Sequence, residues 1–208
     1  EKEAKEKKLV KTGIKIIPDK AKIITYSSSG SVTSTLIEAI RIGKKISVII
    51  SEARPMFEGK KLAIYLSEYS VPVKLVIDAA LPFYFRSADM VLVGADWIAE
   101  EYFINKIGTG SMAKISSLEG IPFYVIATTD KILSDLYRMD IKDFHSPSEI
   151  MEEKFDGIEV ENLYFEEISS QLVSSFITDE GILGSDKIKR IISATRINPE
   201  LVRRLQII

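Results

Sequence analysis

The residues Thr25–Val32, with the sequence TYSSSGSV, place serine hydroxyls and a glycine directly before a helical pattern. Hydroxyls and the free N–H groups of a helix start can together hold a phosphate. An ordinary turn or a helix N-cap has the same composition. A serine nucleophile would need a basic neighbour, and the only histidine, His145, lies far along the sequence. We therefore predict an anion-binding loop, formed by Ser27, Ser28, Ser29 and Gly30.

A second anion-binding pattern is Asn105–Ile115, NKIGTGSMAKI, in which glycines open a helix just after a lysine. Such a helix start suits a phosphate group, although the same residues are common in ordinary loops. The spacing matches neither the P-loop nor the dinucleotide-binding fingerprint. The ligand-binding residues that we predict here are Asn105, Lys106, Gly108 and Thr109.

Asp96, in the sequence VGADWI, directly follows a predicted strand and is the candidate catalytic residue if the protein is an enzyme. A partly buried carboxylate with a shifted pKa can act as a general acid or base, or bind a sugar hydroxyl. A turn or capping carboxylate is the structural alternative. We favour the functional interpretation because the amide of Asn105 and the charge of Lys106 follow on the next segment.

These residues all lie where predicted strands end. Continuous apolar runs such as KIITY, ISVII, VKLVI, MVLVGA and PFYVIA alternate with segments of helical periodicity. Strands of that kind are buried on both faces, which predicts an α/β fold: a Rossmann-like, doubly wound, mostly parallel sheet flanked by helices. Ligands bind at the carboxyl edge of such sheets. The polar residues expected along that edge are Tyr26 to Ser29, Ser51, Glu52, Arg54, Asp78, Asp96, and Thr128 to Asp130.

The composition narrows the possible functions. The chain has 208 residues, a net charge of -2 and no cysteine. A thiolate zinc site, a disulfide framework and a cysteine nucleophile are therefore excluded, and the single histidine has no acidic cluster beside it that would predict a metal site. The near-neutral charge gives no reason to expect direct nucleic-acid binding. No apolar run is long enough for a membrane span, so we expect a cytoplasmic protein, without a cofactor.

The sequence predicts two parts. Residues 1–19 read as the end of a helical N-terminal segment that stops at Gly13, and residues 20–208 as the Rossmann-like domain. Two short helices are expected near the C-terminus, in the sequences DKIKRIISA and PELVRRLQ. The polar stretch DIKDFHSPSEIMEEKFDG is expected to be a surface excursion, with His145 at the surface.

Seven motifs occur in an order that resembles one known superfamily. They are ITYSSSGSV, ISEARPMFEGKKLA, VPVKLVIDAAL, ADMVLVGADWI, INKIGTGSMA, IPFYVIA and FITDEGIL, covering roughly residues 20–183. The superfamily contains the α, β and δ regulatory subunits of initiation factor 2B, their archaeal relatives, and isomerases of ribose-1,5-bisphosphate and methylthioribose-1-phosphate. The resemblance implies a Rossmann-like domain that dimerises and follows a helical N-terminal domain.

The resemblance also implies roles for individual residues. In the isomerases a His-Cys pair begins the first loop, and the Cys and an Asp move protons between two sugar carbons. The matching positions here are Tyr26 and Ser27 for the pair and Asp96 for the Asp, and Arg54, Asn105 and Lys106 match further motif positions. A thiol, with an ordinary pKa of about 8.5, can titrate near neutral pH, whereas a serine without a basic neighbour cannot. The stretch ATTDKIL also departs from the ETYKF found in many relatives.

Three functions are open at this point. The first, which we favour, is an initiation factor 2B regulatory-subunit-like protein with a crevice for a phosphorylated sugar or nucleotide and no catalysis. The second is an aldose-ketose isomerase of ribose-1,5-bisphosphate that works through Asp96. The third is an assembly scaffold without a small-molecule site. For the favoured function we expect a homodimer or higher homo-oligomer and a translation initiation factor as a further partner.

Overall fold

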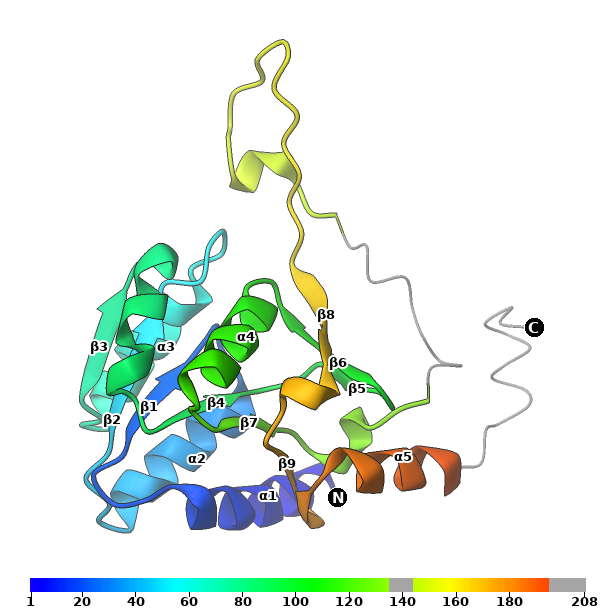
Figure 1. The fold of residues 1–208 in the computed structure, drawn as a ribbon. Helices are drawn as coiled ribbons and strands as arrows, with labels where there is room; N and C mark the ends of the chain where they lie inside the picture. The colour runs from blue at the N-terminus through cyan, green and yellow to red at the C-terminus, as the bar shows by residue number, and fades with distance from the viewer. Residues whose placement is uncertain (135–143, 195–208) are drawn as a thin grey trace.

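The computed structural model describes residues 1–134 and 144–194 (Figure 1). Its centre is a seven-stranded sheet with the order β10-β9-β7-β4-β1-β2-β3. The five strands predicted from apolar runs are all present and parallel: β1 (Lys22–Thr25), β2 (Ser47–Ser51), β3 (Val73–Val76), β4 (Met90–Val93) and β7 (Phe123–Ile126). Strand β9 (Ser175–Thr178) continues the parallel sheet, and β10 (Gly181–Leu183) pairs with it antiparallel. The predicted mostly parallel α/β fold is confirmed.

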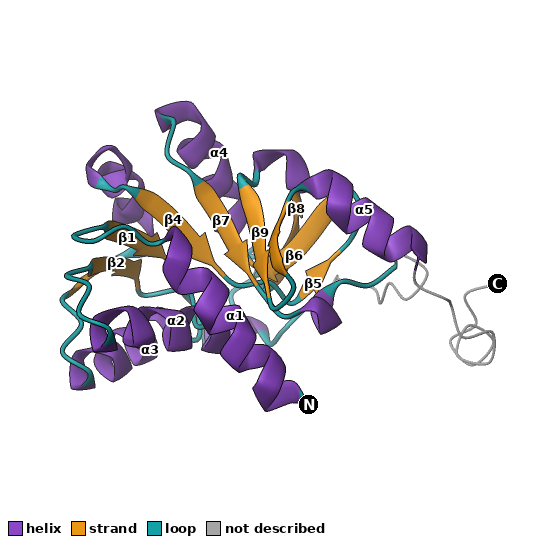
Figure 2. Cartoon of the chain, turned by 90° about the horizontal axis from the view of Figure 1, so that it is seen from below, coloured by secondary structure: helices purple, strands orange, loops and turns teal. Residues whose placement is uncertain are grey.

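Helices cover both faces of the sheet (Figure 2). One face carries α1 (Lys2–Ile16), α2 (Gly30–Arg41) and α3 (Glu58–Glu68), whose buried residues include Leu9, Leu36 and Leu66. The other face carries the 3₁₀ segment η1 (Asp78–Ser87), α4 (Thr109–Glu119) and α5 (Ser185–Ala194), with buried residues such as Phe85 and Met112. Neighbouring residues of the central strands point into opposite cores, which is why these strands are mainly apolar, whereas the edge strand β3 is partly exposed and contains Lys74.

The N-terminal helix differs from the prediction at its end. Helix α1 continues through Gly13 and ends at Ile16, two residues before Pro18. Gly13 is a point of close approach, because a Cβ atom there would lie 2.7 Å from Thr35 Cγ2 on α2. This glycine therefore lets two helices touch instead of ending one of them.

A second, antiparallel sheet was not anticipated from the sequence. It has the order β5-β6-β8 and consists of β5 (Trp97–Ile98), β6 (Tyr102–Lys106) and β8 (Phe165–Ser169). It is attached to the carboxyl end of β4, since the Asp96 backbone N–H donates to the Ile104 carbonyl at 2.9 Å. Strand β6 carries Asn105 and Lys106 into the region beside Asp96.

Between η2 (Thr129–Lys131) and β8, the described residues 144–164 extend away from the rest of the molecule and include η4 (Pro147–Glu149) (Figure 1). We call residues 144–164 the arm. Its base is closed by a bridge between Phe144 and Leu163. The surface excursion expected over residues 140–157 is present in its described part, whereas residues 140–143 and the second predicted C-terminal helix lie outside the described residues.

In the described part of the chain, no helix has the length and apolar character needed to cross a bilayer.

Candidate functional site

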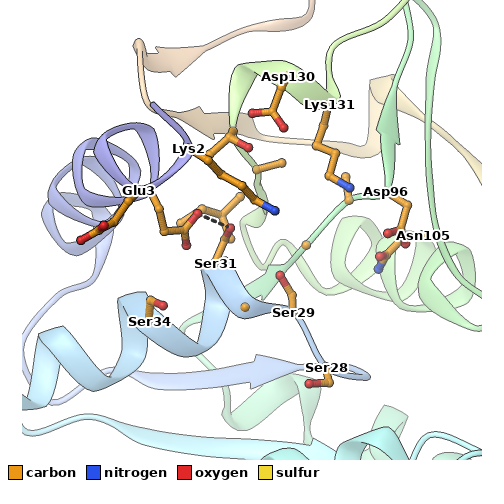
Figure 3. A pocket seen from close by; sticks show the side chains of 17 residues that line it. Lys2, Glu3, Ser28, Ser29, Ser31, Ser34, Asp96, Asn105, Asp130 and Lys131 are labelled. Carbon is orange, nitrogen blue, oxygen red and sulfur yellow. Dashed lines mark hydrogen bonds between the residues drawn. The ribbon is translucent and has the colours of Figure 1, made fainter.

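A pocket of about 790 Å³ lies at the carboxyl edge of β1, β4 and β7. Three loops form most of its wall: the loop from β1 into α2, the loop after β4, and the loop after β7 (Figure 3). Asn105 adds to the wall from β6, and the first turns of α1 close one side with Lys2, Glu3 and Glu6. This is the edge at which a parallel sheet binds ligands.

The loop after β1 and the loop after β4 pack closely together at Ser29 and Gly94. A Cβ atom on Gly94 would lie 2.4 Å from Ser29 Oγ, so only glycine fits there. Ser29 is the N-cap residue of α2 by position, but its side chain makes no capping hydrogen bond. The N–H groups of the first turn of α2 therefore remain near the pocket, where they favour an anion.

Glu6 of α1 also reaches the start of α2. The Ser31 hydroxyl donates to Glu6 Oε2 at 3.2 Å. This contact places a carboxylate beside the positive end of the helix dipole, and it joins α1 to the pocket wall.

Asp96 projects into the open pocket, with Lys131 and Asn105 beside it (Figure 3). The surrounding protein removes water from its carboxylate and so raises its pKa above the ordinary value, and the Lys131 charge partly opposes this rise. Within residues 1–134 and 144–194, the Asp96 carboxylate has no hydrogen-bond partner. It is therefore available to a ligand.

Asn105 is held in a fixed orientation by its neighbours. It is 8% exposed, and its Nδ2 donates to Thr109 Oγ1 at 3.0 Å. The Thr109 hydroxyl in turn donates to the Lys106 carbonyl at 2.6 Å. Thr109 therefore lies behind Asn105 in the first turn of α4 and does not line the pocket.

Lys106 does not face the pocket. Its Nζ lies 2.9 Å from Glu58 Oε1 and 4.1 Å from the centre of the Tyr164 ring, and only 4% of its side chain is exposed. The Lys106 charge is therefore compensated inside the protein, by α3 on one side and by the base of the arm on the other.

The backbone N–H groups at the glycine-rich start of α4 are also hydrogen-bonded to a carboxylate of the protein itself. The backbone N–H groups of Gly108 and Gly110 donate to Glu166 Oε1 at 2.6 and 2.9 Å. Gly108 has a φ of +101°, and a Cβ atom there would lie 2.8 Å from the Tyr26 hydroxyl. The sequence pattern does describe an anion-binding helix start, but the anion that it binds in the structure is a carboxylate of β8.

Two further predicted residues also lie outside the pocket wall. Ser27 does not line the pocket and has a left-handed φ of +59°. Arg54 is exposed, with its guanidinium 4.9 Å from the centre of the Phe57 ring. Its loop is held by Asp78, whose carboxylate accepts the N–H groups of Ala53 and Arg54 at 2.9 and 2.8 Å.

The structure thus divides the ten predicted site residues equally. Those that line the pocket are Ser28, Ser29, Gly30, Asp96 and Asn105. Those that do not are Ser27, Arg54, Lys106, Gly108 and Thr109.

Lys131 is the pocket residue that the sequence analysis most clearly missed. Thr128 and Asp130 were expected at the edge of the sheet, and Lys131 follows them directly in the same loop. Asp179 fixes this loop, because its carboxylate accepts the Thr129 N–H at 2.7 Å and the Thr129 hydroxyl at 3.2 Å. Lys131 could have been predicted as a pocket residue because it follows the end of a predicted strand.

In the part of the chain that the structure describes, no group of three or more His, Cys, Asp or Glu residues is arranged to hold a metal ion.

Comparisons with known proteins show the family to which this chain belongs. The model of the "Initiation factor 2 subunit family" matches residues 1–185. A ribose 1,5-bisphosphate isomerase of Methanocaldococcus jannaschii is 32% identical in an alignment of 181 positions that covers 83% of this chain and 58% of that protein. A methylthioribose-1-phosphate isomerase of Heliobacterium modesticaldum is 32% identical in an alignment of 191 positions that covers 82% of this chain and 55% of that protein.

A solved structure, that of the translation initiation factor eIF-2B of Pyrococcus horikoshii OT3, has a TM-score of 0.76 at 28% identity and matches 88% of this chain and 65% of that one. The chain therefore spans less than two thirds of the length of each of these relatives.

Proposed function

Because this chain belongs to the initiation factor 2 subunit family, we propose that it binds a phosphorylated sugar or nucleotide in the pocket without converting it. Its role would be that of a regulatory-subunit-like protein in the cytoplasm, with a translation initiation factor as partner. The pocket supports binding, since it combines a helix start, an amide, a carboxylate and a lysine at the carboxyl edge of the sheet.

The single observation that carries the non-catalytic proposal is that no thiol can exchange protons opposite Asp96, because Ser27 stands at the position that matches the isomerase cysteine. Aldose-ketose isomerisation moves a proton between two carbons and needs groups that exchange protons near neutral pH. Ser27 lies outside the pocket wall, and the chain has no cysteine. Burial raises the pKa of Tyr26 well above its ordinary value, helped by the carboxylates of Asp78, Glu58 and Glu166.

Isomerisation of ribose-1,5-bisphosphate is the second candidate function. A relative named for this activity is 32% identical to the chain. The observation that favours it is Asp96, an unpaired carboxylate of raised pKa in the pocket. Working through a bound water or a substrate hydroxyl, this carboxylate could shuttle a proton alone.

The first prediction separates these two functions. The purified protein is incubated with ribose-1,5-bisphosphate, and ³¹P NMR is used to follow any ribulose-1,5-bisphosphate, with the M. jannaschii isomerase as assay control. We expect no conversion, because the chain lacks the thiol that would exchange protons with the substrate together with Asp96. Conversion that is lost in Asp96→Asn would establish the isomerase function instead.

Binding is measured in parallel by thermal denaturation with pentose phosphates and nucleoside monophosphates. A ligand that binds only the folded state raises the melting temperature. If no compound shifts it, the pocket does not bind this class and the scaffold function is favoured.

A further inference from the structure

Lys106 is held by two neighbours that come from different parts of the chain. Its ammonium group lies 2.9 Å from Glu58 Oε1 on α3 and 4.1 Å from the centre of the Tyr164 ring at the base of the arm. The sequence predicts that Lys106 binds the ligand, and Asn105, the residue before it, lines the pocket. The ion pair with Glu58 therefore holds a cation next to the pocket, and a ligand phosphate that binds Lys106 must replace the Glu58 carboxylate.

The start of α3 packs directly against the end of β2, and this contact places Glu58 next to Lys106. A Cβ atom on Gly59 would lie 1.8 Å from the Ser51 carbonyl oxygen, so only glycine allows the two elements to approach so closely. The Gly59 N–H also donates to the Glu52 carbonyl at 3.2 Å. The position of the Glu58 backbone is therefore set by packing and does not depend on the ion pair.

The two partners of the ion pair differ in their access to water. The Glu58 side chain is 24% exposed and the Lys106 side chain is 4% exposed. In the described part of the chain, Glu58 Oε2 is buried without a hydrogen-bond partner, and Glu58 lies in the first turn of α3, where the helix dipole stabilises a negative charge. A displaced Glu58 carboxylate can therefore turn toward water and keep part of its stabilisation, whereas the Lys106 ammonium needs an anion beside it.

Glu58 is one of three carboxylates around Tyr26. Burial raises the pKa of Tyr26, and the charges of Asp78, Glu58 and Glu166 raise it further. Asp78 and Glu166 each accept two backbone N–H groups, whereas Glu58 accepts from the side chain of Lys106. A lysine side chain has a flexible four-carbon stem, so the Glu58 contact can be exchanged without breaking a backbone hydrogen bond.

We propose that Glu58 is an affinity-determining residue, whose carboxylate competes with the phosphate of a ligand for the ammonium group of Lys106. The proposal rests on the proposed function, because it concerns a phosphorylated ligand at the same site. Binding replaces one anion by another, so that the buried ammonium stays paired throughout. A phosphate carries close to two negative charges at neutral pH, which favours it over the single charge of the carboxylate that it displaces.

The test is isothermal titration calorimetry with two probes, ribose-1,5-bisphosphate and adenosine monophosphate. Glu58→Gln removes the competing charge and keeps an oxygen that can accept from Lys106. We expect this variant to bind at least one probe at least fivefold more tightly than the parent. The matched control is Glu68→Gln, an exposed glutamate at the end of the same helix, which should leave the dissociation constants within twofold of the parent.

A double-mutant cycle shows whether the gain passes through Lys106. In a Lys106→Met background, the further change Glu58→Gln should alter the dissociation constants less than twofold, because the contested cation is gone. Circular dichroism confirms that each variant is folded. Glu58→Ala and Lys106→Gln repeat the cycle if one of the first variants does not fold.

The outcomes separate this inference from the proposed function. If neither the parent nor Glu58→Gln binds either probe, both are overturned. Binding by the parent that Glu58→Gln leaves unchanged or weakens overturns the competition alone. A gain that persists in the Lys106→Met background also overturns it, since Glu58 would then act on the ligand by general repulsion and not through Lys106.

Discussion

At the scale of single residues, partners decide what a charged group can do. Lys106 and Lys131 are both lysines beside the carboxyl edge of the sheet, yet Lys106 is paired with Glu58 and Lys131 faces an open pocket. Asp96 is the carboxylate that the pocket leaves exposed to a ligand, and the low polarity of its surroundings raises its pKa. Such unpaired groups in a cleft are typical of binding and catalytic sites.

The raised pKa of Asp96 predicts a pH-dependent effect on stability. The folded protein holds the Asp96 proton more tightly than the unfolded chain, so ionisation of this group favours unfolding. Stability from this group is present below the ordinary pKa of 3.8 and is lost as the pH rises through the folded value. Asp96→Asn should therefore unfold at higher urea concentration than the parent at pH 7.

The difference in stability between Asp96→Asn and the parent should narrow as the pH falls toward 3.8. Urea denaturation at pH 7, 5 and 4 measures it, with the exposed Asp156→Asn as control. A parent that is more stable than Asp96→Asn at pH 7 would show that Asp96 is paired in solution.

At the scale of elements, the edge of the sheet is organised by contacts between distant segments. Glu166 of β8 caps the start of α4, Asp78 at the start of η1 holds the loop after β2, and Asp179 between β9 and β10 holds the loop after β7. Each carboxylate satisfies backbone N–H groups that would otherwise lack partners. The Asp179 contact fixes a loop of the pocket wall, and the other two contacts fix neighbouring loops at the same edge of the sheet.

Removal of the Glu166 carboxylate should destabilise this arrangement. Glu166→Ala leaves the N–H groups of Gly108 and Gly110 without their acceptor at the positive end of α4. Charge-assisted hydrogen bonds contribute roughly 1.5–3 kcal/mol, so we expect a loss of about 2 kcal/mol in the free energy of unfolding, measured by urea denaturation.

Glu159→Ala, an exposed glutamate of the arm, is the matched control and should change stability by less than about 0.5 kcal/mol. Equal stability of the two variants would mean that solvent replaces the Glu166 contact without cost.

At the scale of the whole molecule, exposed apolar side chains are the surface through which copies of the chain could associate. The apolar segment 91–108 offers little surface for a dimer, because Val91, Val93, Ile98 and Phe103 are fully buried within one chain. The large exposed apolar side chains lie elsewhere, including Ile64 on α3, Leu75 on the edge strand β3 and Phe83 in η1.

We expect a homodimer or a higher homo-oligomer because of the family resemblance and this exposed surface. Multi-angle light scattering at micromolar concentration should give at least twice the chain mass of 23.3 kDa. A monomer under these conditions, unchanged by ligand, would contradict the expectation.

The sequence by itself determined the layered fold and the edge at which the pocket lies. Apolar runs between helical segments predicted the five parallel strands, because strands buried on both faces need apolar side chains at successive positions, although the edge strand β3 is partly exposed and contains Lys74. Ser28, Ser29, Gly30, Asp96 and Asn105 line the pocket, as expected for residues at or beside the carboxyl edge of one sheet. These features depend on short stretches of sequence, such as an apolar run and the polar residues that follow it, and can therefore be predicted without the structure.

Only the tertiary structure decided which charges remain available. Glu58 precedes Lys106 by 48 residues, and Glu166 follows Gly108 by 58. Pairings over such separations depend on how α3, β6, β8 and α4 pack, and no short pattern in the chain records them. The sequence could show that an anion-binding helix start and a lysine were present, but the packing determined that carboxylates of the protein itself bind both, and that Lys131 faces the pocket.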